Sequence, residues 1–348
     1  MGPVIIPIRI VPRLALCLLA MAGLCASAED VHVRVSPHVT TGKERVSEFP
    51  TVQMALDHHL FATPGKDGKP GRVFLEIQPG VYHERILVTQ NHTNITLVGK
   101  GKSPQDVVIT NSLNANTAGG TFFTETAEIN GDGFEADNIT FENDAGNTSQ
   151  AVAAAVRADR VIFKHCRFLG NKDTLFADYG RQYYVDSYIE GGVDFIFGNA
   201  AAVFDRSEIH AMAPGYLTAQ SRTSVDQATG FVIANSRVTS SIPAGASTTD
   251  PRGTVLGRPW RLYSRVVYLN TELSADVDPA GWRLWNNRND ENKAYYAEYR
   301  SSGPGARVSD RVAWSHQLTP AQAAQFEPKI FLAGQDHWDA PAEAERLP

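Results

Sequence analysis

The chain has 348 residues, of which 43% are hydrophobic and 20% are charged, and its formal net charge is −6. This composition is typical of a globular protein, and the length suits one large domain or two ordinary ones. The acidic balance argues against nucleic acid as a partner, and it means that an anionic substrate would need a locally basic site.

The first 28 residues have the pattern of a secretory signal peptide. Arg9 and Arg13 supply positive charge, Leu14–Leu24 is an apolar run too short to span a bilayer, and Ala26-Ser27-Ala28 offers small residues for cleavage. No second apolar run of spanning length follows, which argues against a membrane anchor. The sequence therefore predicts a secreted protein, extracellular or periplasmic, with no membrane association. Loss of the two arginines moves the net charge from −6 to −8.

Two of the three cysteines, Cys17 and Cys25, leave with the signal peptide, so the mature chain has no intrachain disulfide. It must be held together by its core alone. The remaining Cys166 lies in an apolar, β-rich stretch and is predicted to be a buried strand residue, not a catalytic thiol. No Cys/His or His/Glu cluster with ligand spacing appears, so neither a metal nor a cofactor is predicted.

Short β-rich segments recur along the chain at a nearly constant spacing. They begin at Asn94, Asn138, Arg160, Gln182 and Ala202, which gives steps of 44, 22, 22 and 20 residues, and the first step is interpreted as two periods. Strands at this period without helical patterns between them do not make βαβ units. They predict a parallel β-helix, in which each coil buries its inward residues against its neighbours. Later strands come after longer intervals, which predicts inserted loops.

Such a solenoid needs a cap at each end. Thr51–Leu56 has helical spacing and is predicted to cover the N-terminal end, and Pro320–Phe326 is predicted to form a short helix at the other end. No linker divides the rest of the chain. Residues 29–348 are therefore predicted to form one all-β domain with short capping helices and long loops, acting as a monomer.

Two aspartates lie about one coil apart, because Asp173 and Asp194 are separated by 21 residues. Neighbouring rungs would place their carboxyls ~5 Å apart. Two carboxyls this close cannot both ionise easily, so an acid would lie beside a nucleophile, as ester or glycoside cleavage requires. Gln150, 23 residues before Asp173, is predicted to share their column, and Arg258 to reach Asp194 from a later loop.

Each of these residues also has a simpler interpretation. Asp173 could be an ordinary turn residue, and Gln150 could belong to a ladder of stacked amides. Arg258 could lie on a surface loop. Asp194, however, precedes an apolar run, where a charge is costly unless it is paired, and this favours a functional role.

Five segments occur in the order and spacing found in pectin methylesterases, and the likeness runs from about Val46 to Trp338. They are Gly80-Val81-Tyr82-His83-Glu84, Gln150-Ala151-Val152-Ala153, Lys172-Asp173-Thr174-Leu175, Asp194-Phe195-Ile196-Phe197-Gly198 and Leu256-Gly257-Arg258-Pro259-Trp260. The chain thus resembles that family. The resemblance implies a right-handed parallel β-helix that hydrolyses the C6 methyl esters of galacturonate units in pectin, with methyl-esterified homogalacturonan as its partner.

The resemblance also implies roles for individual residues. Asp194 resembles the nucleophile that forms an acyl-enzyme, and Asp173 the acid that protonates methanol and then activates water. Gln150 resembles an oxyanion donor, and Arg258 the group that holds Asp194 ionised. Paired with arginine, Asp194 is expected to keep a low pKa while the pKa of Asp173 rises. Aromatic residues placed beside the sugar rings would be Trp260, Phe197, Phe176 and Trp282.

One position departs from the family, which usually has glutamine where this chain has Lys172. Lysine can also donate to an oxyanion, but its charge favours ionised Asp173 and it is a flexible point donor. Two alternatives to the esterase therefore stay open. One is another pectin-directed hydrolase, similar to a polygalacturonase, since paired carboxyls also suit glycoside cleavage. The other is a non-catalytic relative that binds polysaccharide.

Overall fold

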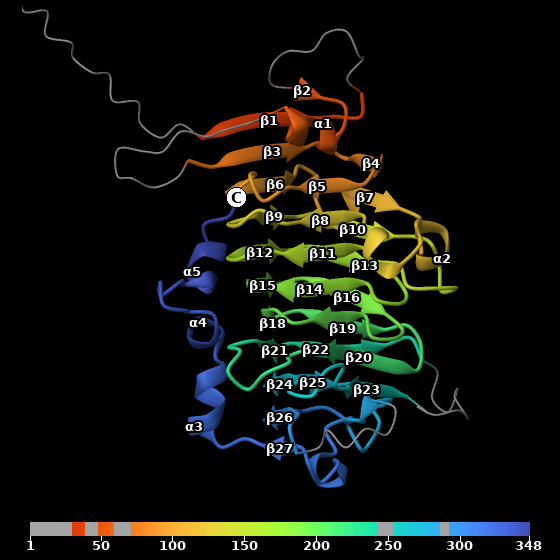
Figure 1. Cartoon of the computed structure of the whole chain (residues 1–348), viewed down its shortest axis with the longest axis vertical. Helices are drawn as coiled ribbons and strands as arrows, with labels where there is room; N and C mark the ends of the chain where they lie inside the picture. The colour runs from red at the N-terminus through yellow and green to blue at the C-terminus, as the bar shows by residue number, and fades with distance from the viewer. Residues whose placement is uncertain (1–29, 39–47, 59–70, 243–252, 286–291) are drawn as a thin grey trace, which may run out of the picture.

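The computed structural model describes residues 30–38, 48–58, 71–242, 253–285 and 292–348. The described chain forms three parallel sheets, and it passes from sheet to sheet before it returns one rung further along (Figure 1). This confirms the predicted parallel β-helix, whose connections are right-handed as parallel crossovers are. The predicted signal peptide, residues 1–28, lies outside the described residues.

The three sheets are named A, B and C in the order in which a coil visits them. Among the described residues, sheet A has twelve strands, in the order β2 (Glu48–Phe49), β1 (Val31–Val35), β3 (Val73–Ile77), β6 (Ile95–Gly99), β9 (Glu135–Asp137), β12 (Val161–Lys164), β15 (Arg181–Val185), β18 (Ala201–Asp205), β21 (Gly230–Ala234), β24 (Arg265–Leu269), β26 (Tyr295–Tyr299) and β27 (His316–Gln317).

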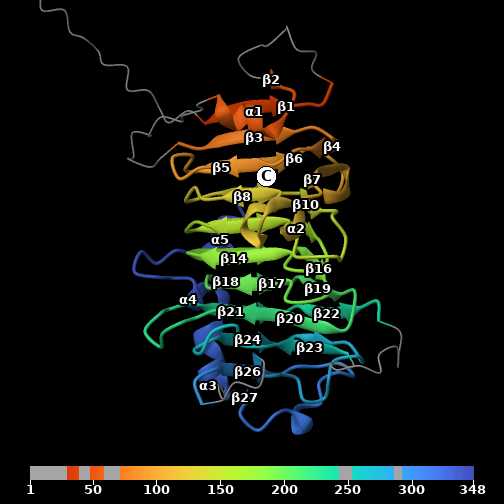
Figure 2. The ribbon, with the colours of Figure 1, turned by 45° about the vertical axis from the view of Figure 1, so that its right-hand side comes forward.

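Sheets B and C follow the same rungs. In the described part of the chain, sheet B has eight strands: β25 (Glu272–Leu273), β22 (Arg237–Ser240), β19 (Glu208–Ala211), β16 (Tyr188–Gly191), β13 (Arg167–Leu169), β10 (Thr140–Asn143), β7 (Val107–Asn111) and β4 (Gly80–His83). Sheet C has seven described strands, which Figure 2 shows one above another: β23 (Thr254–Gly257), β20 (Gly215–Gln220), β17 (Ile196–Gly198), β14 (Leu175–Tyr179), β11 (Ala154–Arg157), β8 (Ala127–Ile129) and β5 (Ile86–Val88).

The core is built by side chains that repeat from coil to coil. Strand side chains alternate between the two faces of a sheet, so the inward residues of each rung meet the same positions of the next rung. Phe163, Tyr184 and Phe204 pair in register on β12, β15 and β18. Their rings stack with centroids 5.1 Å and 4.7 Å apart. Burial of this kind against both neighbours stabilises every inner coil.

One coil is longer than the sequence period suggested. The interpretation of the step from Asn94 to Asn138 as two periods is wrong. Strand β9 pairs directly with β6, so one coil separates these two strands, and Asn138 lies between β9 and β10 of the next sheet. The extra length lies in η1 (Pro104–Asp106), α2 (Ala115–Ala118) and η2 (Thr121–Phe123). This excursion places Phe122 of η2 against Phe176 of sheet C, with ring centroids 4.9 Å apart.

The N-terminal cap is confirmed. Helix α1 (Val52–Asp57) begins after Thr51, whose hydroxyl accepts a hydrogen bond from the backbone N–H of Met54 at 3.1 Å. Such a cap satisfies a backbone donor that would otherwise lack a partner. The helix buries Val52, Ala55 and Leu56 against the end of the core.

The short helix predicted at Pro320–Phe326 is confirmed, but it does not cap the opposite end of the solenoid. The C-terminal segment contains α3 (Pro320–Ala323), η5 (Ala324–Phe326), α4 (Pro328–Phe331) and α5 (Ala340–Ala344), and it runs back along the flank of sheet A (Figure 1). The outer face of that sheet is apolar, and Val203 and Val232 are buried in one cluster with Phe326 and Leu332. An apolar face needs cover, which is why the helices lie on the side of the solenoid.

A buried ion pair anchors the last coils. Arg311, which follows η4 (Val308–Asp310), donates two hydrogen bonds to Glu298 at 2.7 and 3.2 Å, and both side chains are almost fully buried. Arg311→Met should lower the free energy of unfolding by about 3–5 kcal/mol, because it leaves Glu298 buried without its partner. The matched control is Lys329→Met, which removes an exposed pair with Asp339 and should cost about 1 kcal/mol or less. Chemical denaturation measures both, and equal losses would contradict this assignment.

Candidate active site

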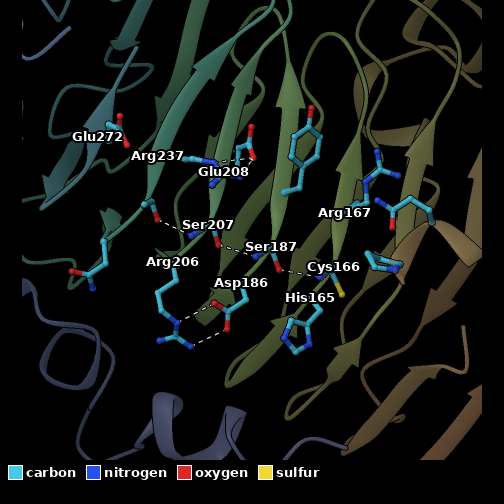
Figure 3. A pocket seen from close by; sticks show the side chains of 15 residues that line it. His165, Cys166, Arg167, Asp186, Ser187, Arg206, Ser207, Glu208, Arg237 and Glu272 are labelled. Carbon is cyan, nitrogen blue, oxygen red and sulfur yellow. Dashed lines mark hydrogen bonds and ion pairs between the residues drawn. The ribbon is translucent and has the colours of Figure 1, made fainter. Parts of the chain in front are cut away.

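Several concave regions lie on the described part of the chain, and one of them, although large, is structural. A groove of about 950 Å³ runs along the corner between sheets A and B (Figure 3). Arg206 there pairs with Asp186 at 2.9 Å, and Arg237 pairs with Glu208 at 2.5 Å. Cys166 is buried at this corner, as predicted, and burial raises the pKa of its thiol. Paired charges and an inert thiol give the groove no reactive group.

A smaller cavity of about 310 Å³ lies where the chain passes from sheet B into sheet C. All five residues that the sequence predicted as catalytic contribute to its wall. The lining residues are Thr121, Phe122, Gln150, Lys172, Asp173, Val193, Asp194, Phe197, Ala219, Arg258, Trp260 and Trp285. Segments that are more than 130 positions apart in the sequence therefore meet at one site.

Asp173 and Asp194 occupy equivalent positions on neighbouring coils. Lys172 forms a bridge with Val193, and Leu175 pairs with Ile196, so the register is the same on both sides of the aspartates. Both aspartates have left-handed backbone conformations, with φ of 63° and 52°. Aspartate is one of the few residues that tolerate this region, and equal conformations direct the two side chains the same way.

Gln150 lines the same cavity but does not share their register. The backbone N–H of Ala151 donates to the carbonyl of Lys172, which places Ala151, not Gln150, opposite Asp173. The Gln150 side chain accepts a hydrogen bond from the Ser149 hydroxyl at its Oε1 atom, at 3.1 Å. This bond fixes the amide so that its Nε2 group, which is the hydrogen-bond donor of the side chain, remains available to the cavity.

Arg258 binds both carboxylate oxygens of Asp194. Its Nε donates to Oδ1 at 2.9 Å, and its Nη2 donates to Oδ2 at 2.5 Å. The guanidinium lies between the rings of Tyr216 and Trp285, with its central carbon 3.9 Å from each ring centroid. A planar cation held between two aromatic faces has little freedom to rotate, so Arg258 fixes the orientation of Asp194.

Burial and mutual repulsion separate the acidities of the two aspartates. Burial raises the pKa of Asp173 to about 7, and the negative charge of Asp194 adds to the rise. Burial also raises the pKa of Asp194, against the bonds from Arg258 and the charge of Lys172. The expectation that Asp194 keeps a low pKa is therefore wrong, because loss of water outweighs the arginine. The marked rise still belongs to Asp173, whose carboxyl Arg258 does not bind.

Lys172 presents a positive charge to both carboxylates. Its backbone is fixed, since its carbonyl accepts the N–H of Ala151 at 3.0 Å. Its charge lowers the pKa of Asp173 and of Asp194. Among the described residues it forms no ion pair, so its ammonium remains able to bind an anion in the cavity.

Two of the four predicted aromatic contacts lie on the cavity wall. Phe197 and Trp260 line it, with ring centroids 6.1 Å apart. Phe176 is not among the lining residues: its ring stacks on that of Phe197, with centroids 4.6 Å apart. Its role is to support the wall.

The prediction that Trp282 lies beside the substrate is wrong. Trp282 is completely buried and packs between Tyr268 and Tyr296 in the core of the last coils. Trp285, three residues later, faces the cavity in its place. Nothing in the sequence around these two tryptophans distinguishes the buried ring from the exposed one.

The sequence also missed Tyr216 and Phe122. Phe122 is 46% exposed and lies on η2, with its ring 4.9 Å from that of Phe176. Two adjacent phenylalanines that follow two glycines and Thr121, in a stretch with no strand pattern, were the available signal. Exposed aromatic rings in a loop often mark a binding surface.

The described residues include no cluster of three or more His, Cys, Asp or Glu side chains that could hold a metal ion. The same part of the chain has no helix with the length and hydropathy of a membrane span.

Comparison with known proteins identifies the family. A family model for pectinesterases matches residues 38–335. The chain belongs to the pectinesterase family. Pectinesterase 1 of Citrus sinensis is 40% identical over 312 residues, which are 86% of this chain and 51% of the relative. Pectinesterase 31 of Arabidopsis thaliana is 39% identical over 309 residues, which are 84% and 93% of the two chains. This pectinesterase-family chain thus spans about half the length of some curated relatives and nearly all of others.

Solved structures of the family share the fold. A pectin methylesterase from carrot superposes with a TM-score of 0.78 at 34% identity, covering 93% of this chain and 98% of that one. A pectin methylesterase in complex with a hexasaccharide gives a TM-score of 0.72 at 27% identity, covering 92% and 100%. The architecture described above is therefore that of the family.

The charges around Asp173 lead to a titration experiment. In the wild type, Asp173 should titrate at about pH 7. Lys172→Gln should raise the pKa of Asp173 because it removes a positive charge, and Asp194→Asn should lower it because it removes a negative one. Carboxyl NMR of protein labelled at aspartate measures each shift. Lys102→Gln, which removes an exposed charge outside the cavity, is the control. Shifts of the opposite sign, or none, would refute the proposed arrangement of charges.

Proposed function

We propose that the mature chain hydrolyses the C6 methyl esters of galacturonate units in pectin and releases methanol. The observation that carries this proposal is the pair of carboxyls in the cavity: Asp194 is held by two bonds from Arg258, and Asp173 has a pKa of about 7. Membership of the pectinesterase family supports the same reaction.

In the proposed first step, a carboxylate oxygen of Asp194 attacks the ester carbonyl. The carbonyl oxygen becomes negative, and Gln150 and Lys172 are the donors that can stabilise it. Each such donor typically contributes roughly 3–4 kcal/mol to the transition state. Asp173 gives its proton to the departing methanol, and the galacturonyl group remains bound to Asp194 as an anhydride.

In the second step, ionised Asp173 takes one proton from water, whose oxygen attacks the anhydride. The C–O bond to Asp194 breaks and Asp173 is again protonated. The galacturonate leaves as a carboxylic acid, which releases its remaining proton to the solvent and becomes a free carboxylate. Arg258 stabilises Asp194 as it regains its negative charge. Phe197, Trp260 and Trp285 form an aromatic wall against which sugar rings can pack.

The remaining expectations belong to the same proposal. The chain would be exported after removal of residues 1–28, and residues 29–348 would act as a single monomeric domain. Its partner would be methyl-esterified homogalacturonan, without a membrane, nucleic acid or cofactor.

Methanol release from methylated galacturonan tests the reaction. Asp194→Asn should reduce the rate about 10³-fold or more, because the amide is not a nucleophile. Asp186→Asn is the matched control, since Asp186 lies in the corner groove and should leave the rate unchanged. Both variants should be folded at the assay temperature, and Asp194→Asn should have the lower thermal midpoint because it leaves the mostly buried Arg258 without its charged partner.

Other outcomes would favour a different function. Undiminished methanol release in Asp194→Asn would refute the nucleophile. New reducing ends without methanol would favour a polygalacturonase-like hydrolase. If the wild type released no methanol but Lys172→Gln did, the natural protein would be a binder that has lost catalysis.

A further inference from the structure

The charges in the cavity are few enough to balance explicitly. Of its described lining residues, Lys172 and Arg258 are basic, and Asp173 and Asp194 are acidic. Arg258 and Asp194 neutralise each other through their two hydrogen bonds. The charge that an entering ligand meets therefore depends on Lys172 and on whether Asp173 carries a proton.

The proton on Asp173 sets the sign of that balance. With Asp173 protonated, two positive charges face one negative charge, and the cavity is positive by one. With Asp173 ionised, the cavity is neutral. No other charged side chain lines the cavity in the part of the chain that the structure describes, so these four groups account for the linkage.

The proposed reaction converts a neutral group into an anion at this point. A methyl ester carries no charge, whereas the product carboxylate is ionised at all pH values above about 4, as other carboxylates are. We propose that Lys172 makes the cavity a proton-linked binding site for the free carboxylate of galacturonate, so that the enzyme is retained by its own product. The choice of galacturonate as ligand rests on the proposed function.

The position of Lys172 supports this assignment. Its backbone is held by the bond to Ala151, and its ammonium is close enough to affect both aspartates. A neutral amide at this position would leave the cavity uncharged while Asp173 is protonated. The lysine therefore stabilises every anion at the site, which includes the reaction intermediate and equally the acid product.

Two consequences follow for the enzyme at work. De-esterified pectin should inhibit it, and the inhibition should strengthen as the pH falls through about 7, the pKa of Asp173. The inhibition should also weaken with salt, because it depends on one charge in a cavity that is open to solvent.

Calorimetric titration with a fully de-esterified galacturonate hexamer tests the proposal without turnover. At pH 5.5 and low salt, Lys172→Gln should bind the hexamer at least about tenfold more weakly than the wild type, which is the usual weight of a charged hydrogen bond. Lys172→Arg should restore most of the binding. Lys102→Gln, which changes the same charge outside the cavity, should bind as the wild type does.

A second variant, Asp173→Asn, tests whether binding of the hexamer depends on the proton of Asp173. Wild-type binding should weaken between pH 5.5 and pH 8.5, whereas Asp173→Asn, which mimics the protonated acid, should bind equally at both. Equal affinities of wild type and Lys172→Gln would overturn the proposal, as would a pH dependence that persists in Asp173→Asn. These titrations need no methanol release. If the protein released no methanol but still bound the hexamer with the predicted dependence on Lys172 and on pH, only the proposed esterase reaction would be refuted.

Discussion

The bidentate bond between Arg258 and Asp194 is the interaction on which the rest of the site depends. It keeps a largely buried carboxylate charged and fixes the direction of its oxygens. The ion pair offsets the cost of burying that charge. The arginine is itself held in place between the rings of Tyr216 and Trp285. The charge of Asp194 also adds to the rise that burial causes in the pKa of Asp173, so this ion pair influences the chemical character of both carboxyls.

The solenoid supplies the distances that this pair requires. Successive coils repeat the same left-handed turn at the entrance to sheet C, and an aspartate occupies that turn twice in succession. Arg258 directly follows β23, which lies two rungs beyond β17 in sheet C. Rigid repeats thus place the reacting groups, and irregular segments complete the wall with Phe122 and Trp285.

Much of this arrangement could be predicted from the sequence. The strand period indicated the β-helix, and the spacing of Asp173 and Asp194 reflects a real register because both lie in regular coils. Prediction failed where the period breaks. The excursion between β6 and β9 was counted as two coils, and Gln150 was assigned to a column from which it is displaced by one position. Trp282 is buried and Trp285 lines the cavity because Tyr268 and Tyr296 pack against Trp282. These tyrosines lie close to Trp282 only in the folded chain. Burial also reversed the expected pKa shift of Asp194, a cost that local sequence does not reveal.

The central claim is that Arg258 controls the reactivity of Asp194 by geometry as well as by charge. Methanol release by Arg258→Lys tests this directly, since lysine keeps the positive charge but cannot bind both oxygens or stack between the two rings. The account predicts a folded protein whose kcat falls about 10- to 100-fold, as expected for the loss of one charge-assisted hydrogen bond. A kcat equal to that of the wild type would contradict it.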